Sequence, residues 1–231
     1  MNTPTVKMLA GAFRYWERRQ QVVSNNLANA ATDGFRAERV FARVLDGVDA
    51  PVAESRTDFR DGSVTQTGNP LDVALKGDGF LVLETADGER FSRGGSLAVD
   101  DAGVLVDAEG HAVLGESGPL VLPPGEIAID ARGRLSVDGE EVGRLRIRRF
   151  GGATPPRREG AAHFAAAATD AVQEATDTEV LQGHVEQSNV NPVEALVEMI
   201  TVQRAYGALE RSARTVDGVM ETVANRLGRV D

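Results

Sequence analysis

Residues 191–227 read NPVEALVEMITVQRAYGALERSARTVDGVMETVANRL. Asn191 is a preferred N-cap residue, Pro192 suits the first helical position, and Glu194 stands three residues after the cap. Apolar side chains then recur at alternating steps of three and four, which keeps them on one face of a helix. This stripe consists of Ala195, Met199, Val202, Tyr206, Leu209, Ala213, Val216, Met220, Val223 and Leu227. The sequence therefore predicts a long helix that runs to about Leu227.

The N-terminal segment carries a second stripe with the same spacing, formed by Val6, Leu9, Phe13, Trp16, Gln20, Val23, Leu27 and Ala30. We expect its helix to begin near Thr3, with Pro4 at the first helical position, and to end around residues 30–33, with Gly34 as the stop signal. A single helix cannot bury such a stripe alone. The two patterns together predict that the ends of the chain meet each other, or neighbouring copies, with a different domain between them.

Between the two helices the apolar period changes from that of a helix to that of a strand. Over residues 71–150 apolar and polar residues alternate, and Asp-Gly and similar pairs punctuate the stretch as hairpin turns do. Short strands between frequent turns predict an antiparallel β domain. Residues 35–70 read as an extended connector, and residues 151–186 as a connector that returns to the last helix. Within the latter, residues 161–168 favour helix by propensity alone.

Composition and charge argue against several classes of protein. Apolar residues make up 42% and charged residues 26% of the chain, which is ordinary for a folded protein. The net charge of −10 argues against a nucleic-acid partner, and no apolar run approaches the roughly 20 residues of a membrane span. There is no cysteine, so disulfides, thiolate zinc sites and thiol nucleophiles are excluded. Because the first residues lack the pattern of a cleavable signal peptide, we expect a cytoplasmic protein or one exported without a cleaved signal.

No residue pattern indicates catalysis or metal binding. The three histidines, His111, His163 and His184, are scattered, and none stands at metal-ligand spacing with a second donor. Residues 100–103 lack the alternating oxygen ligands of a calcium loop, and residues 115–118 lack the spacing of a nucleophile elbow. We therefore predict a protein that is not an enzyme and that has no metal, no cofactor and no small-molecule substrate.

Asparagines interrupt the N-terminal stripe near its end. Asn25, Asn26 and Asn29 lie beside Leu27, and Asn25 and Asn29 fall on one face of the expected helix. An amide inside a helix interface fixes the register of the partners, because a misaligned partner leaves it unpaired. The alternative is that these residues hydrogen-bond locally at the end of the helix. Spacing alone does not separate the two.

Three blocks of sequence also stand in a recognisable order. They are SNNLAN at 24–29 with TDGFR at 32–36, GNPLDVA at 68–74 with GDGFLV at 77–82 and FSRGG at 91–95, and QSNVNPVE at 187–194 with QRAY at 203–206. These blocks closely resemble the signatures of the bacterial flagellar basal-body rod and hook proteins. The resemblance covers essentially the whole chain.

The resemblance implies a structural, self-assembling subunit of the flagellar rod, whose terminal helices pair into a coiled-coil inner domain. It implies other rod proteins and copies of the chain as partners, together with the flagellar type III export apparatus, and a place in the basal-body rod that spans the periplasm. Residues 29–37 and 120–125 are most similar to the proximal rod members of the family. Distal rod members are the near alternative, and an assembly adaptor or cap protein is another. In this family residues 161–168 return as an extended segment, which we prefer to a helix.

The expected fold class is α+β, with long N- and C-terminal helices forming a coiled-coil inner domain and a central antiparallel β domain. Residues 1–34 and 187–231 would form the coiled-coil axial domain, 35–70 the extended connector, 71–150 the β domain and 151–186 the return connector. The predicted subunit-interface residues are Leu9, Phe13, Trp16, Val23, Asn25, Asn26, Leu27, Asn29, Met199, Val202, Tyr206, Leu209, Val216, Met220 and Val223. The predicted signature residues are Gly34, Phe35, Ser188, Asn189, Asn191, Pro192, Gln203 and Arg204.

Overall fold

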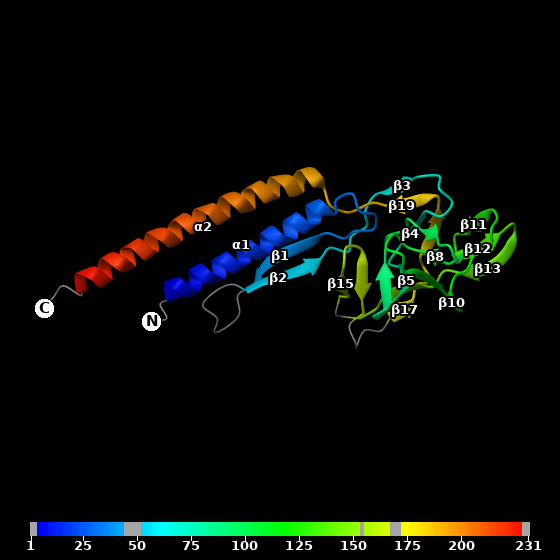
Figure 1. The fold of residues 1–231 in the computed structure, drawn as a ribbon, viewed down its shortest axis with the longest axis horizontal. Helices are drawn as coiled ribbons and strands as arrows, with labels where there is room; N and C mark the ends of the chain where they lie inside the picture. Colours follow the sequence, from blue (N-terminus) through cyan, green and yellow to red (C-terminus); the bar gives the residue numbers. More distant parts are fainter. Residues whose placement is uncertain (1–3, 44–51, 153–154, 167–171, 228–231) are drawn as a thin grey trace. The chain divides into compact units, whose positions relative to one another are not determined.

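A computed structural model describes residues 4–43, 52–152, 155–166 and 172–227 (Figure 1). The chain divides into two compact units, which we call the helical unit and the β unit. The helical unit is drawn from Met1–Ala28, Ala37–Asp58 and Asn191–Asp231, and the β unit from Asn29–Arg36 and Phe59–Val190. Each unit therefore combines segments from distant parts of the sequence.

The helical unit contains the two helices and one hairpin. Helix α1 spans Pro4–Ala28 and helix α2 spans Pro192–Leu227. Strands β1 (Glu38–Arg43) and β2 (Val52–Thr57) pair antiparallel over their full lengths. Asn191 caps α2 as its sequence indicates, because its Oδ1 accepts the backbone N–H of Val193 at 3.0 Å. Neither helix, within the described residues, has the combination of length and hydropathy that a bilayer crossing requires.

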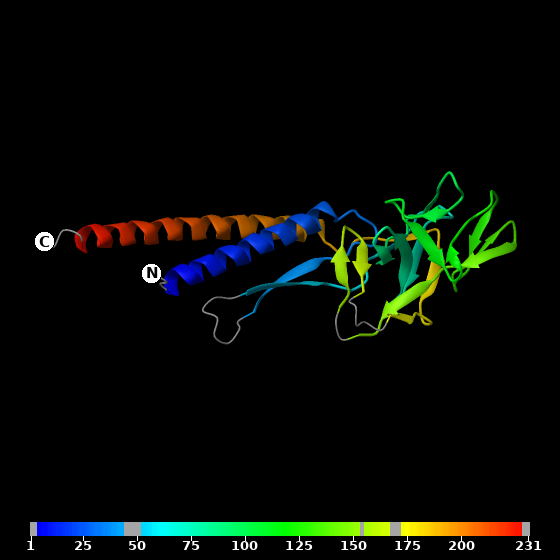
Figure 2. The ribbon, with the colours of Figure 1, turned by 60° about the horizontal axis from the view of Figure 1, so that its bottom comes forward.

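The prediction of a coiled-coil inner domain is wrong. Helix α1 packs against α2, but it also packs against β1 and β2, and the hairpin lies alongside α1 in both views (Figures 1 and 2). Helix α2 has 36 residues and α1 has 25, so α2 is longer by 11 residues, or about 16 Å at 1.5 Å per residue. The apolar spacing identifies the buried face of each helix, but it does not specify that the partner is one helix of matching length.

The first helix also ends earlier than expected, at Ala28 rather than at residues 30–33. The Asn29 carbonyl accepts the backbone N–H of Thr32 at 3.1 Å, which makes a turn after the helix. Gly34 then adopts φ +68°, in the left-handed region. A Cβ at this position would lie 2.2 Å from the Gly94 nitrogen, so glycine is required there both for its backbone conformation and for the close approach.

The β unit is antiparallel throughout its described strand pairs. Its largest sheet follows the order β15-β16-β6-β5-β9-β8-β7, with β10 added on β9 and with β14 pairing both β5 and β17. A second sheet is β11-β12-β13, and two pairs, β18-β4 and β19-β3, bring the return segment back onto earlier strands. The strands are β3 (Val64–Gln66), β4 (Val73–Lys76), β5 (Phe80–Thr85), β6 (Gly88–Ser92), β7 (Ala98–Val99), β8 (Leu105–Val106), β9 (Ala112–Gly115), β10 (Gly118–Pro119), β11 (Ile127–Ile129), β12 (Arg134–Val137), β13 (Glu140–Arg144), β14 (Ile147–Phe150), β15 (Arg157–Glu159), β16 (His163–Ala165), β17 (Val172–Glu174), β18 (Glu179–Gln182) and β19 (His184–Glu186).

Strand β5 carries core side chains on both of its faces. Leu81 and Leu83 belong to one buried cluster, and Phe80 and Val82 belong to a second cluster. Because successive strand residues point to opposite faces, a continuous apolar run such as this one predicts a strand covered on both sides. The first cluster is aliphatic, whereas the second gathers aromatic rings, including Phe164 of β16.

The two expected connectors contain strands of their own. Residues 35–70 hold the β1–β2 hairpin and β3, and residues 151–186 hold β15 to β19. Of the alanine-rich stretch 161–168, residues 163–165 form β16, which pairs with both β15 and β6. Residues 167 and 168 lie outside the described part of the chain. Strand pairing therefore overrides the helical propensity of the alanines here.

Candidate functional site

Many of the predicted residues lie in two places: the contact between α1 and α2 in the helical unit, and the ends of the segments that enter and leave the β unit. In the first, the rings of Phe13 and Tyr206 meet edge to face at a centroid distance of 5.5 Å. Arg19 pairs with Glu198 at 2.7 Å. Partial burial lowers the pKa of the Arg19 guanidinium, but the Glu198 carboxylate outweighs it and leaves that pKa raised. Apolar and ionic contacts thus join the two helices.

The predicted stripe on α2 is its most buried face, but its burial is incomplete. Ala195 and Val202 are buried, and Val202 is fully inaccessible. Met199, Tyr206, Leu209 and Val216 are half-buried, and Met220 is exposed. The Val223 side chain lies outside the described part of the structure. On α1, Val23 is buried, and Leu9, Phe13, Trp16 and Leu27 are half-buried. Part of the apolar surface of both helices therefore remains exposed to solvent.

The asparagines do not share one environment. The Asn26 side chain is buried; its Nδ2 donates to the Glu38 carbonyl at 2.8 Å, and its Oδ1 accepts the Glu38 N–H at 2.9 Å. Asn26 therefore joins α1 to the start of β1. Asn25 is exposed on α1, whereas Asn29 lies beyond the helix, where its Oδ1 accepts the Thr32 hydroxyl at 3.2 Å.

The signature residues converge in the β unit, at the ends of the segments that enter and leave it. Gly34 donates its N–H to the Glu186 carbonyl at 2.7 Å. The carbonyl of Phe35, whose side chain is fully buried, accepts the Asn189 N–H at 3.3 Å. The Asn189 amide in turn donates to the Arg60 carbonyl at 2.8 Å. Ser188 closes a local turn, since its Oγ accepts the N–H of residue 190 at 3.2 Å.

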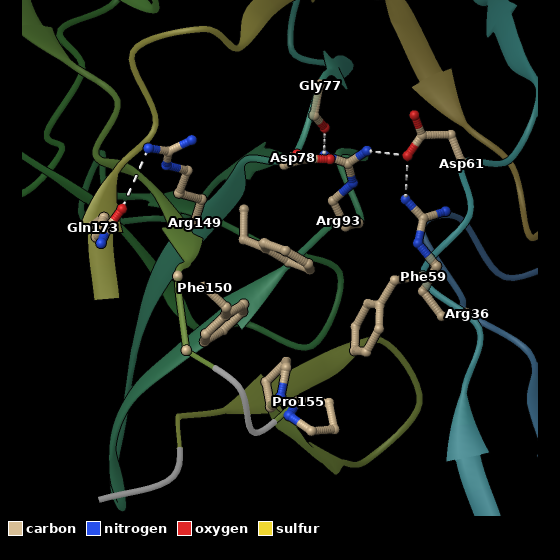
Figure 3. A pocket seen from close by; sticks show the side chains of 14 residues that line it. Arg36, Phe59, Asp61, Gly77, Asp78, Arg93, Arg149, Phe150, Pro155 and Gln173 are labelled. Atoms are coloured by element: carbon tan, nitrogen blue, oxygen red, sulfur yellow. Dashed lines mark hydrogen bonds and ion pairs between the residues drawn. The ribbon is translucent and has the colours of Figure 1, made fainter. Parts of the chain in front are cut away.

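A buried charged cluster lies at the same place and was not among the predicted site residues. Glu186 is 1% exposed, and its two oxygens lie 2.5 Å from Arg36 Nη1 and 3.0 Å from Arg93 Nε. Asp61, which is 60% exposed, accepts from Arg36 at 3.2 Å and from Arg93 at 2.8 Å (Figure 3). Glu186 Oε1 also accepts the backbone N–H of Gly62 at 2.9 Å. We call these four charged residues the arginine–glutamate cluster.

The cluster fixes three chain segments through one carboxylate. Burial is the main cause that lowers the pKa of the Arg93 guanidinium; the neighbouring Arg36 charge adds to this, and Glu186 opposes it. Arg93 Nη1 also donates to the carbonyls of Gly77 and Gly79. Arg36 and Arg93 stand inside the recognised sequence blocks, but nothing in their spacing shows that they would share a buried carboxylate.

A pocket of about 490 Å³ in the β unit is lined in part by this cluster, through Arg36, Asp61 and Arg93. Its lining combines arginine side chains with the rings of Phe59 and Phe150 (Figure 3) and with that of Phe80. No serine, threonine, cysteine, histidine or lysine is among the described residues that line it. Among the described residues, the lining therefore offers no hydroxyl or thiol nucleophile beside a histidine or lysine base.

The remaining signature residues lie on α2, around its first three turns. Asn191, Pro192, Gln203 and Arg204 are exposed. Asn191 also donates from its side chain to Glu194 Oε1 at 3.2 Å, which completes the cap. These residues define the start and the exposed side of α2 rather than a cavity.

Three family models match the chain in order. "Flagella basal body rod protein" matches residues 17–36, "Flagellar hook protein FlgE/F/G D1 domain" residues 74–139, and "Flagellar basal body rod FlgEFG protein C-terminal" residues 181–227. The first model ends at Arg36, and the last one begins shortly before Glu186. The matched segments therefore supply most of the arginine–glutamate cluster.

Similar proteins align over nearly the full chain. Flagellar basal-body rod protein FlgF of Escherichia coli (strain K12) is 36% identical, with 90% of this chain and 91% of the relative covered. FlgF of Caulobacter vibrioides is 31% identical, with 93% and 94% covered. Flagellar basal-body rod protein FlgG of Bacillus subtilis is 26% identical, with 91% and 94% covered.

Proposed function

The chain belongs to the flagellar basal-body rod protein family, and we propose that it is a structural subunit of the proximal part of the flagellar rod, the drive shaft of motility. Its similarity to FlgF proteins, at 29–36% identity, exceeds its similarity to the FlgG proteins, at 26–28%. The FlgG similarity makes a distal rod protein the second candidate. The relatives are structural proteins, so the chain acts by assembly and not by catalysis.

The observation that carries this proposal is the exposed apolar face of α2. Val193, Leu196, Val197 and Ile200 are 70%, 50%, 60% and 44% exposed. They stand at steps of three and four and therefore share one side of the helix. Contiguous apolar patches of this kind mark protein interaction sites. This side of α2 is distinct from the stripe that faces α1.

We infer that the helical unit contacts other rod proteins and copies of the chain. The predicted interface residues on the partly buried stripe, from Met199 to Met220, would be covered further in the rod. The chain would be exported by the flagellar type III apparatus without a cleaved signal and would reside in the rod where it spans the periplasm. No nucleic acid and no insertion into the membrane enter this proposal.

The test is a substitution that leaves the monomer intact. Because Val197 and Ile200 are exposed, replacing either with aspartate changes monomer stability by about 0.5 kcal/mol or less. In a rod interface the same carboxylate is buried without a partner, which costs several kcal/mol. We therefore expect Val197→Asp and Ile200→Asp to abolish both incorporation into purified basal bodies and swimming.

The matched control is Val121→Asp, because Val121 is a valine of the β unit with 57% exposure. We expect it to support swimming. Circular dichroism of each purified variant checks that the fold is retained. Normal swimming with Val197→Asp or Ile200→Asp protein in basal bodies would contradict the proposed role of α2.

A further inference from the structure

A group of side chains in the β unit, away from the arginine–glutamate cluster, has the composition of a metal site. Asp107 follows β8, His111 precedes β9, and His163 begins β16. One donor atom from each lies within 4.8 Å of the others. The two imidazole rings meet edge to face at a centroid distance of 5.1 Å. The sequence does not reveal this group, because the fold brings His163 next to a turn more than 50 residues earlier in the chain.

The turn between β8 and β9 positions the Asp107 carboxylate. Its Oδ1 accepts the backbone N–H groups of Glu109 at 3.0 Å and of His111 at 2.8 Å. Its Oδ2 points toward both histidines, at 2.8 Å from His163 Nε2 and 3.5 Å from His111 Nδ1. One oxygen thus holds the turn, and the other is available to a shared ligand.

Burial shows that a simple ion pair does not account for the whole group. Asp107 and His163 are each 7% exposed. The hydrogen bond to Asp107 raises the pKa of His163, and the same bond lowers the pKa of Asp107 against the opposing effect of burial. His111 Nδ1 is also buried, yet it makes no hydrogen bond. A buried nitrogen without a hydrogen-bond partner, facing an oxygen, is the arrangement that a bound cation would satisfy.

We propose that Asp107, His111 and His163 bind a divalent transition-metal ion, with zinc as the first candidate. Two imidazole nitrogens and one carboxylate oxygen form a ligand set that suits zinc rather than magnesium or calcium. Zinc–nitrogen distances near 2.0–2.1 Å place neighbouring ligands of a tetrahedral site about 3.3–3.5 Å apart. The separation between His111 Nδ1 and Asp107 Oδ2 already matches this value. The separation between His163 and Asp107 widens by about 0.5 Å when the ion replaces the proton between them.

Glu109 positions the ring of His163 in this site. Its Oε2 lies 3.7 Å from His163 Nδ1, the nitrogen on the side away from the ion. Histidine ligands regularly direct their second N–H to a carboxylate, which fixes the ring and raises its basicity. Water completes the coordination sphere at the fourth position, since His111 is only half-buried.

The bound ion would tie β16 to the turn between β8 and β9. Strand β16 pairs with β6 and carries Phe164 into the aromatic cluster. A ligand that binds the folded chain and not the unfolded chain raises the melting temperature with its concentration. The site is therefore a structural cross-link for the return segment of the β unit.

The test uses the whole chain without an affinity tag after treatment with EDTA, at mildly alkaline pH, where fewer protons compete with the metal for its ligands. We expect isothermal titration with Zn²⁺ to show one saturable site, and Co²⁺ to give the visible absorption of a tetrahedral nitrogen and oxygen environment. Glu109→Gln should weaken the affinity for Zn²⁺ by about 10- to 100-fold, because it removes the carboxylate that orients His163. His111→Ala removes a ligand and should weaken the affinity at least as much. His163→Gln should abolish binding and remove the Zn²⁺-dependent rise in Tm.

His184→Ala is the matched control, because His184 lies in β19 and its Nδ1 contacts the Gln182 carbonyl at 2.7 Å. It should bind Zn²⁺ as the wild type does. His111 is only half-buried, so His111→Ala tests the site even where His163→Gln lowers stability. Absence of saturable Zn²⁺ binding in the wild type, or equal affinity in His111→Ala, would overturn the proposal and leave a plain histidine–aspartate ion pair.

Discussion

The helical unit and the β unit differ in how completely they bury their own apolar surface. In the described residues, the buried apolar side chains of the helical unit are Val22, Val23, Ala195 and Val202, and all others that are buried belong to the β unit. On α2 four exposed apolar residues lie together, from Val193 to Ile200, whereas the exposed large apolar residues of the described β unit are valines far apart in the sequence. The β unit therefore buries most of its large apolar side chains, while the helical unit leaves a contiguous apolar patch exposed.

The same contrast holds for buried charge. In the β unit Glu186 is 1% exposed and is satisfied by two arginines and a backbone N–H. In the helical unit the pair of Arg19 and Glu198 keeps side-chain exposures of 32% and 42%. A buried cluster in which two arginines share one carboxylate requires all its members to be in place, whereas a half-exposed pair tolerates movement. The buried charges therefore hold their segments of the β unit in place more firmly than the Arg19–Glu198 pair holds the two helices.

The largest expected effect is a loss of stability in the β unit when the buried carboxylate of Glu186 is removed. Glu186→Gln keeps the size of the side chain but leaves Arg36 and Arg93 with only the exposed Asp61 as a charged partner. Breaking a buried pair in this way costs about 3–5 kcal/mol. We expect hydrogen exchange of the β5 and β6 amides to accelerate accordingly. Fluorescence of Trp16, the only tryptophan, reports the helical unit separately.

The matched control for Glu186 is Glu179→Gln on the neighbouring return strand β18. Glu179 pairs with Lys76 at 3.4 Å, and their side chains are 49% and 72% exposed. Such exposed pairs contribute about 0–1 kcal/mol. If the two variants exchanged at the same rate, the arginine–glutamate cluster would contribute no more than a surface pair, and the contrast between the units would fail.

A second prediction compares one leucine from each unit. Leu83 is fully buried in β5, so Leu83→Ala should destabilise the β unit by about 2–5 kcal/mol. Leu209 is half-buried on α2, so Leu209→Ala should cost the helical unit about half as much in the monomer. Urea unfolding followed by hydrogen exchange measures each unit separately. Equal costs would show that the helical unit is packed as fully as the β unit, and would break the comparison.

Helix caps and hairpin turns were predictable from the sequence, because they depend on residues that are close together in the chain. The cap at Asn191 and Pro192 begins α2 at the expected residue, and the helix continues to Leu227, the last residue that the structure describes. The Asp138-Gly139 pair makes the expected two-residue hairpin, with positive φ at both positions, between β12 and β13. The family resemblance is confirmed by relatives at up to 36% identity over most of the chain.

Contacts between segments far apart in the chain were not predictable from the spacing of apolar residues. The 3–4 stripe of α1 predicted a helical partner, but a hairpin whose strands read ERVFAR and VAESRT occupies part of its surface. These strands lack clear alternation, so they read as a connector. The arginine–glutamate cluster was missed for a related reason. Arg36 and Glu186 are 150 residues apart, and a sequence does not show that a charge is buried until the fold brings its partners together.

The smallest expected loss of stability concerns two asparagines of α1, one buried and one exposed, within the helical unit. Asn26 makes two hydrogen bonds to the Glu38 backbone, whereas Asn25 is exposed. Asn26→Ala removes the side-chain partner of the part-buried Glu38 N–H and carbonyl, which costs about 1–3 kcal/mol, while the exposed Asn25→Ala stays within about 0.5 kcal/mol. We expect faster hydrogen exchange in β1 and β2 for Asn26→Ala alone. If Asn25→Ala changed rod geometry in electron micrographs without changing this exchange, Asn25 would set the register between subunits. Equal exchange in both variants and the wild type would mean that the hairpin is held to α1 by its other contacts.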